Sequence, residues 1–186
     1  MDLVHVEIEA KLKVDSPREV EQRLSQCGAS FVGEVMQTDW YFDTADRELT
    51  AADKCLRLRI ENTGSRERLV LACKGPKERD DYKKRQEAEL EVNDAAATEA
   101  LLGGLGYYRA LAFNKRRRLW SLSGCEVALD ELPLLGTFVE IEGPDAGAIA
   151  RVQAMLGLSD VPHTPDSYAC LIERQLSQQG QREIYL

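Results

Sequence analysis

The chain has 186 residues, 44% of them hydrophobic and 30% charged, which is the composition of an ordinary globular protein. Its formal net charge of −8 would repel the backbone of a long nucleic acid, so that class of partner is excluded. Five cysteines without a Cys-x-x-Cys pair, no secretory segment and no apolar run of membrane-spanning length predict one cytoplasmic domain over residues 1–186, with neither a zinc site nor a membrane partner.

The first predicted element is a strand over residues 4–14, where apolar and polar residues alternate. This alternation places Glu7 and Glu9 on one face and apolar residues on the other. A helix follows, because Ser16 and Pro17 form a start signal and Gly28 a stop signal. The chain therefore opens with a strand followed by a helix.

The rest of the chain continues as strands with interspersed helices. The same alternation predicts strands over residues 38–44, 54–61, 68–74, 83–92, 113–122, 125–131 and 137–142. Helices are expected over about 94–105, 145–156 and 164–178, and a polar loop over 77–81. Together these elements favour an α+β fold, an eight-stranded antiparallel β-barrel (tunnel) with helices packed on the outside.

Charged side chains recur on one face of these strands. A Glu-x-Glu motif occurs at residues 7–9, 87–89 and 140–142, and pairs of cations occur at 57/59, 83/85 and 115/117. Taken one strand at a time, such a face is more often simply solvated, with ion pairs between neighbouring strands. Across six strands the face is nearly all Glu, Lys and Arg, which favours a metal-assisted anion site instead.

The order of several short motifs carries a resemblance to a known family. The motifs are Glu7-x-Glu9-x-Lys11, Tyr41-x-Asp43, Leu58-Arg59, Lys74-Gly75-Pro76, Arg85-x-Glu87, Lys115-x-Arg117, Asp130, Leu135-Gly136-x-Phe138-x-Glu140-x-Glu142 and Ser167-Tyr168. In this order they resemble the CYTH superfamily, the triphosphate tunnel metalloenzymes. That group includes class IV adenylyl cyclases, thiamine triphosphatases and inorganic tripolyphosphatases, and the chain looks most like the cyclase branch.

The resemblance implies a role for each charged residue. It implies Mg²⁺ or Mn²⁺ bound by Glu7, Glu9, Glu140 and Glu142, with Glu87 and Glu89 as further candidates. It implies a small-molecule triphosphate contacted by Lys11, Arg59, Lys74, Lys83, Arg85, Lys115 and Arg117, with Asp130 completing the site. The catalytic set it implies is Glu7, Glu9, Lys11, Arg59, Lys74, Arg85, Lys115 and Arg117.

The sequence leaves more than one reaction possible. The first is conversion of ATP to cyclic AMP and pyrophosphate, although the His-Phe-x-x-Lys segment of the cyclase branch is absent before Glu7. The retained Glu142 resembles the hydrolases of the family, which favours hydrolysis of tripolyphosphate, thiamine triphosphate or a nucleoside triphosphate. A non-catalytic polyphosphate-binding module and a homodimer are also left open. Trp40 and Trp120 are expected to pack rather than to stack on a substrate.

Overall fold

The computed structural model describes residues 4–76, 83–177 and 180–186, with the backbone alone at 4–7 and 83–84. Its strands are β1 (Val4–Val14), β2 (Ser30–Asp43), β3 (Cys55–Asn62), β4 (Glu67–Lys74), β5 (Lys83–Val92), β6 (Tyr108–Leu122), β7 (Cys125–Leu132), β8 (Gly136–Glu142) and β9 (Glu183–Ile184). They form one sheet in the order β2-β3-β4-β5-β1-β8-β7-β6-β9.

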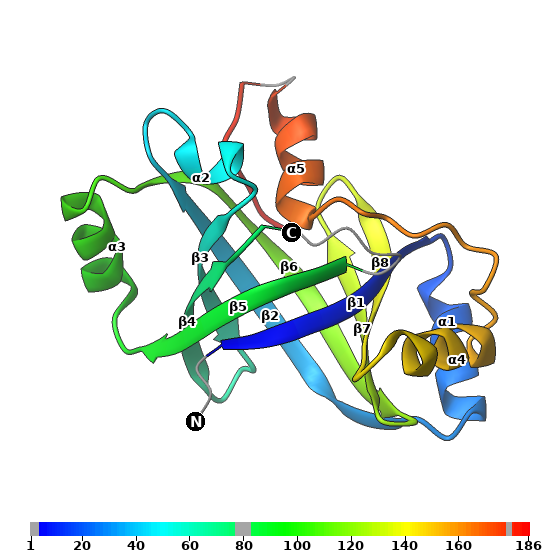
Figure 1. The fold of residues 1–186 in the computed structure, drawn as a ribbon. Helices are drawn as coiled ribbons and strands as arrows, with labels where there is room; N and C mark the ends of the chain where they lie inside the picture. Colours follow the sequence, from blue (N-terminus) through cyan, green and yellow to red (C-terminus); the bar gives the residue numbers. More distant parts are fainter. Residues whose placement is uncertain (1–3, 77–82, 178–179) are drawn as a thin grey trace.

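An additional pairing closes this sheet into a tunnel. Strand β6 pairs with β2 along almost its whole length, from Tyr108 opposite Asp43 to Ser121 opposite Ser30. Since β2 and β6 stand at the two ends of the row of eight antiparallel strands, their pairing closes the row into a ring (Figure 1). The short strand β9 pairs in parallel with β6, where Ala112 and Phe113 lie opposite Glu183 and Ile184. The predicted eight-stranded antiparallel architecture is confirmed.

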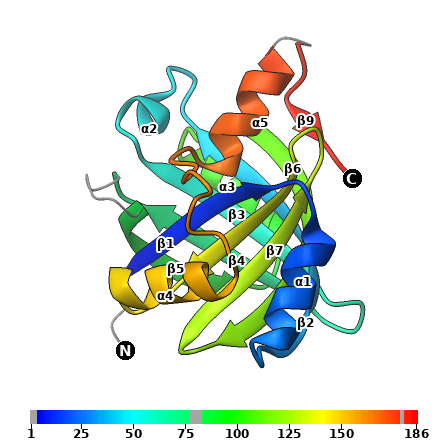
Figure 2. The same ribbon diagram turned by 90° about the vertical axis from the view of Figure 1, so that its right-hand side faces the viewer.

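Three helices cover the apolar outer face of the tunnel. Helices α1 (Pro17–Gln26) and α4 (Ala146–Met155) pack on β1, β7 and β8, where Leu12, Val127 and Ile141 are buried in the largest core cluster. Helix α3 (Ala95–Gly104) packs through Leu102 on the outer face of β2, β3 and β4. Figure 2 shows α1 and α4 together on the same side of the sheet. Burial of these apolar stripes leaves the charged strand faces pointing inward.

Helix α5 (Tyr168–Ser177) has a different position. It packs through Tyr168 and Ile172 on Phe113 and Phe138, which share their strand faces with the inward-pointing Lys115 and Glu140. Both views place α5 beside the short helix α2 (Glu48–Ala51) at the same end of the tunnel. An ion pair between Arg47 and Glu173 joins the two segments. This helix therefore covers one end of the tunnel rather than its outside wall.

Most predicted elements are present, with differences at their ends. The first helix begins as predicted, because the Ser16 hydroxyl accepts a hydrogen bond from the Glu19 amide at 3.4 Å. Strand β2 begins at Ser30 rather than residue 38, and β6 begins at Tyr108 rather than residue 113, because these two long strands pair with each other beyond their alternating stretches.

The last helix and two short elements also differ from expectation. Helix α5 begins at Tyr168 rather than Thr164, because the Thr164 amide donates to the Lys11 carbonyl at 2.7 Å and so extends the sheet. Helix α2 and strand β9 lack a sequence signal and were not predicted. The loop predicted over 77–81 lies outside the described residues. No helix in the described part of the chain is both long and apolar enough to span a membrane.

Candidate active site

The tunnel encloses a cavity of about 810 Å³ whose wall is formed by the charged strand faces. The predicted residues on this wall are Glu9, Lys11, Arg59, Lys74, Arg85, Glu87, Glu89, Lys115, Arg117, Glu140 and Glu142. They come from six strands that lie far apart in sequence. The inward orientation predicted from strand alternation therefore holds for each of these side chains, and the structure brings them to one cavity.

Asp130 on β7 is the centre of the ion pairs on one side of the cavity. Its carboxylate accepts hydrogen bonds from Lys115 Nζ at 2.8 Å and from Arg117 Nε and Nη2 at 2.7 and 2.6 Å. Arg117 also donates to Glu140, whose other oxygen lies 3.3 Å from Lys11 Nζ. Asp130 is fully buried, so it orients the cations from behind rather than lining the open cavity.

A second carboxylate with the same function was not predicted. Asp39 on β2 is buried and accepts two hydrogen bonds from Arg59, to Oδ1 at 2.7 Å and to Oδ2 at 2.8 Å. It lies two residues before Tyr41 on the same strand, so the alternation around the Tyr41 motif could have identified it. Arg59 is thus held in the wall by a bidentate ion pair.

A further group of ion pairs lies on β3, β4 and β5. Lys74 Nζ lies 2.6 Å from Glu87 Oε2, and Arg57 Nη2 lies 3.9 Å from Glu87 and 3.8 Å from Glu89. Arg57 is buried, and its Nε has no hydrogen-bond partner among the described residues. The sequence pattern paired Arg57 with Arg59 but did not assign it to the phosphate-binding set.

Arg85 makes contacts that the sequence did not suggest. Its guanidinium donates from Nε to the Gly75 carbonyl and from Nη2 to the Asp53 carbonyl, each at 2.6 Å. These bonds tie the end of β4 to the segment before β3 at the rim of the cavity. A contact between Arg85 and phosphate stays a prediction, since in this state the side chain fixes two backbone segments.

Four carboxylates lie together where β1, β8 and β7 are adjacent. Glu9 on β1 lies opposite Glu142 on β8, which in turn lies opposite Glu126 on β7. With Glu140 these side chains line a small cavity of about 20 Å³ beside Arg117. Glu126 was not predicted, although it shares its strand face with Asp130 four residues later. Within the described residues, no three acidic, histidine or cysteine side chains already converge as a formed metal site.

Two predicted site residues can be placed only by their backbone. Glu7 lies opposite Arg85 and Lys83 lies opposite Glu9 in the pairing of β1 with β5, but both side chains lie outside the described residues. Trp40 packs in the outer cluster with the Arg109 guanidinium 4.1 Å from its ring centre, and Trp120 is buried in the outer core. The tryptophans therefore pack, as expected.

Burial and neighbouring charges shift the pKa values of the charged groups in the wall. Burial raises the pKa of Asp130, but Arg117 and Lys115 outweigh it and leave that pKa below its usual value. Burial also acts to raise the pKa of Asp39, and Arg59 holds it well below its usual range. Burial and repulsion by Arg117 lower the pKa of Lys115 to about 8, with attraction to Asp130 opposing them. The carboxylates of Asp130 and Asp39 thus stay charged near neutral pH, and the ammonium group of Lys115 loses its charge as the pH rises through about 8.

The comparisons with known proteins agree with this geometry. The family model of the CYTH domain matches residues 5–154, which include all eight strands of the closed tunnel except the first residue of β1. The chain belongs to the CYTH family. Adenylate cyclase CyaB of Aeromonas hydrophila is 31% identical over 150 residues, covering 76% of this CYTH chain and 74% of the relative. A candidate adenylate cyclase of Methanocaldococcus jannaschii is 29% identical over 137 residues, covering 74% and 76%.

Solved structures share the fold of this CYTH protein. A Pyrococcus horikoshii protein superposes with a TM-score of 0.80 at 26% identity, covering 91% of this chain and 99% of its own. A candidate adenylyl cyclase of Hippeastrum, described as having a dominant triphosphatase activity, superposes with a TM-score of 0.69, covering 94% and 96%. At 17% identity this second likeness shows the fold alone.

Proposed function

We propose that this CYTH protein is a divalent-metal-dependent enzyme that acts on a linear triphosphate in its tunnel, with ATP cyclisation as the first candidate reaction. One observation carries the proposal: Lys11, Arg59, Lys115 and Arg117 line one cavity, each held by a carboxylate in the wall. A linear triphosphate carries negative charge along its whole length, so such a wall can contact every phosphate. The cyclase names of the two sequence relatives support the first candidate reaction.

The chemistry of the carboxylates fits a Mg²⁺ or Mn²⁺ ion. Glu9, Glu140, Glu142 and Glu126 supply hard oxygen donors from three neighbouring strands around one small cavity. These four would hold the metal, with Glu7 as a fifth donor from β1. Bound there, a divalent cation would neutralise charge on the triphosphate and on the leaving pyrophosphate.

The protein's own contribution to the reaction is binding and orientation. Phosphoryl transfer needs positioning and charge stabilisation more than a side-chain nucleophile. Among the described residues that line the cavity none is a histidine, which agrees with such a mechanism. Arg117 and Lys115 would contact the phosphates, while Asp130 keeps both cations in place without entering the cavity.

In cyclisation, one bond to the α-phosphorus forms and another breaks. The ribose 3′-hydroxyl oxygen forms a bond to the α-phosphorus while its proton is released to solvent, and the bond from the α-phosphorus to the oxygen that bridges to the β-phosphorus breaks. Pyrophosphate leaves and remains bound to the cations of the wall, which offset its charge. Holding the ribose close to the α-phosphorus converts the attack into an intramolecular event that needs no water.

Hydrolysis of a triphosphate is the second candidate, and Glu126 favours it. With Glu126 opposite Glu142, the site has a fourth carboxylate beside the three from β1 and β8. An additional carboxylate gives capacity for a second cation that activates a water molecule. The reported triphosphatase activity of the Hippeastrum protein concerns that protein, and here it supports testing the same reaction.

A product assay tests the proposal. The purified protein is incubated with ATP, thiamine triphosphate or tripolyphosphate, each with Mg²⁺ or Mn²⁺, and cyclic AMP, pyrophosphate and orthophosphate are separated. We expect cyclic AMP and pyrophosphate in equal amounts from ATP. If orthophosphate is the only product, the reaction is hydrolysis rather than cyclisation. Binding of tripolyphosphate without turnover of any substrate would identify a non-catalytic module.

A further inference from the structure

Tyr168, the first residue of α5, lies against two of the cations that we assign to phosphate binding. The Nζ atom of Lys11 from β1 lies 4.1 Å from the centre of the Tyr168 ring, and that of Lys115 from β6 lies 4.8 Å away. Both distances are within the range of cation–π attraction. Tyr168 as a whole residue is only 6% exposed, so these contacts are largely shielded from water. One neutral ring thus joins two lysines from different strands.

The other groups that contact these lysines differ from the Tyr168 ring because they carry a net negative charge. Lys11 lies 3.3 Å from Glu140, and Lys115 lies 2.8 Å from Asp130, so each ammonium also faces a carboxylate. A carboxylate offsets the positive charge of the ammonium group that it contacts, and it competes with a phosphate for that ammonium group. An aromatic ring attracts the ammonium by its quadrupole and carries no net charge. The ring can therefore hold a lysine in position and leave its charge for the substrate.

The hydroxyl group of Tyr168 does not explain its position. This oxygen is buried and has no hydrogen-bond partner among the described residues. A buried hydroxyl without a partner destabilises a protein rather than stabilising it. The ring, by contrast, packs edge-on against Phe138 at a centroid distance of 5.3 Å as well as against the two ammonium groups. The contacts of this residue are therefore those of an aromatic ring.

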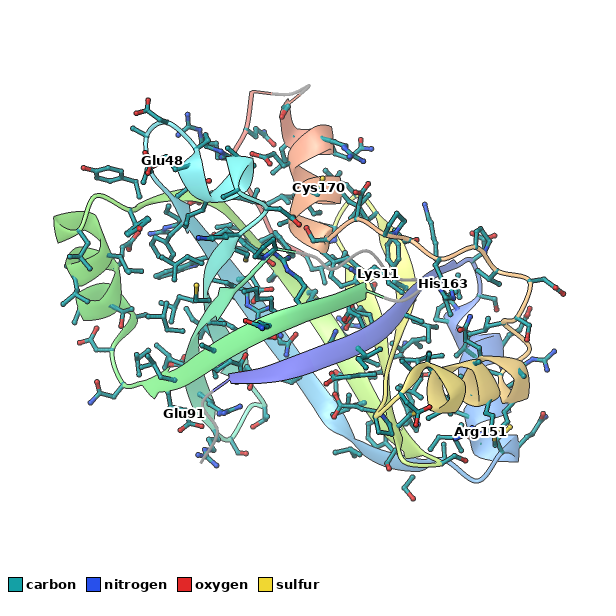
Figure 3. All side chains as sticks on the ribbon, in the orientation of Figure 1. Lys11, Glu48, Glu91, Arg151, His163 and Cys170 are labelled. Atoms are coloured by element: carbon teal, nitrogen blue, oxygen red, sulfur yellow. The ribbon has the colours of Figure 1, made fainter. Side chains whose placement is uncertain are left out.

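The segment before α5 fixes the ring relative to Lys11. The backbone of Thr164 donates to the Lys11 carbonyl at 2.7 Å, and His163 forms a bridge with Leu12. Lys11 Nζ in turn donates to the Asp166 carbonyl at 3.2 Å. Figure 3 shows Lys11 just below α5, with His163 beside it. Docking of this segment on β1 thereby brings the aromatic ring to the lysine.

We propose that Tyr168 is a positioning residue whose aromatic ring aligns Lys11 and Lys115 toward the bound triphosphate. Helix α5 is then part of the active site, because its first residue completes the arrangement of cations that β1 and β6 begin. The inference rests on the proposed triphosphate function but concerns a residue to which the family resemblance gave no role. It requires the ring and not the hydroxyl group.

The test compares two substitutions at this position. Tyr168→Phe keeps the ring and Tyr168→Leu removes it, and steady-state turnover of ATP and tripolyphosphate is measured for both. We expect Tyr168→Leu to lower kcat/KM about 30-fold and the conservative Tyr168→Phe to restore it to within about threefold of wild type. Ile172→Ala, which loosens α5 in the same cluster, and Tyr185→Leu, at an exposed tyrosine, serve as controls.

A second measurement does not depend on activity. Ring currents of Tyr168 shift the NMR signals of the ε-methylene protons of Lys11 and Lys115, which are assigned with Lys11→Arg and Lys115→Arg. We expect these shifts to persist in Tyr168→Phe and Ile172→Ala and to vanish in Tyr168→Leu. If wild type shows the shifts and binds tripolyphosphate without turnover, the positioning role stands while the enzymatic proposal fails. Equal losses of kcat/KM in Tyr168→Phe and Tyr168→Leu, or a loss in Tyr168→Leu no greater than in Ile172→Ala, would overturn the inference.

Discussion

At the scale of single residues, most cations of the tunnel wall are oriented by a buried or half-buried carboxylate. Asp130 orients Lys115 and Arg117, and Asp39 orients Arg59. Burial of such charges is costly unless they are paired, which explains why the wall alternates in sign. The proposed triphosphate and metal would replace water in this arrangement and would find both signs of charge already in position.

Glu9→Gln is expected to lower metal-dependent turnover at least about 100-fold and leave the fold intact. Glutamine has nearly the same size, but it lacks the anionic oxygen that a hard cation requires. Turnover is measured across a Mn²⁺ titration, and Mn²⁺ affinity is measured separately by calorimetry. Glu131→Gln, in an exposed ion pair with Arg116, is the matched control. Full activity with unchanged Mn²⁺ affinity in Glu9→Gln would remove this residue from the metal site.

The lowered pKa of Lys115 leads to a prediction of how substrate binding depends on pH. Its pKa is lowered to about 8, so the ammonium is charged below that pH and becomes neutral as the pH rises through it. We expect the KM for the triphosphate to rise above about pH 8. In Lys115→Arg the rise should disappear, because a guanidinium keeps its charge throughout this range. A KM profile of the arginine variant that still rises above pH 8 would assign the dependence to another group.

At the scale of elements, strand register decides which carboxylates share a site. Glu9, Glu142 and Glu126 lie directly opposite one another across β1, β8 and β7. A shift of any of these strands by one residue would turn its glutamates to the outer face. Outer-face packing of α1 and α4 on Leu12, Val127 and Ile141 prevents such a shift, because it would expose these buried side chains.

Glu142→Ala is expected to separate the two candidate reactions. If Glu142 and Glu126 support a cation that activates water, the substitution should reduce orthophosphate release at least about tenfold more than cyclic AMP formation. Cyclisation uses an internal hydroxyl group and needs no attacking water. Both products are quantified from one reaction mixture containing ATP. Equal reduction of the two products would indicate that Glu142 serves a single metal common to both reactions.

The junction between β8 and α4 predicts a position sensitive to substitution. A Cβ atom at Gly143 would lie 2.8 Å from Cys125 Sγ and 3.0 Å from Ile149 Cγ1, which is closer than side chains pack. We expect Gly143→Ala to lower the free energy of unfolding by about 1–3 kcal/mol, measured by urea denaturation. Gly103→Ala in α3, where a Cβ meets nothing within 4 Å, should raise it by about 0.5–1 kcal/mol.

At the scale of the whole molecule, closure of the tunnel couples ligand binding to the stability of the fold. The cavity wall draws on all eight strands of the closed ring, so the binding site exists only when the whole ring is formed. Helices α2 and α5 cover one end and are joined by the ion pair of Arg47 with Glu173. Ligands that bind only the folded tunnel must therefore stabilise the whole sheet.

Tripolyphosphate with Mn²⁺ is expected to raise the melting temperature of the protein. At a ligand concentration one hundred times the dissociation constant, binding adds about 2.7 kcal/mol to the free energy of unfolding. Thermal melting is followed by circular dichroism with each component alone and with both together. We expect the largest shift with both, because the cation offsets repulsion between the glutamates and the triphosphate. No shift with both would contradict a triphosphate site.

The sequence by itself determined the eight main strands apart from some of their ends, the inward faces of these strands, and the family. Alternation in 4–14, 54–61 and 137–142 placed Glu9, Arg59 and Glu140 on one face, because side-chain direction in a strand has a period of two residues. Charged residues on these faces were then sufficient to suggest an anion site. The alternation involves only neighbouring residues, so it can be recognised in the sequence without knowing how the strands pair.

Only the tertiary structure decided which groups contact one another. Pairing between strands distant in sequence closes β2 on β6. The same pairing brings Arg59 to its hydrogen-bonded ion pair with Asp39 and places Glu126 beside Glu142. Tyr168 reaches Lys11 and Lys115 because the segment before α5 docks on β1, which no local pattern encodes. Contacts between residues remote in sequence are set by the packing of the whole sheet, and here that packing forms the site.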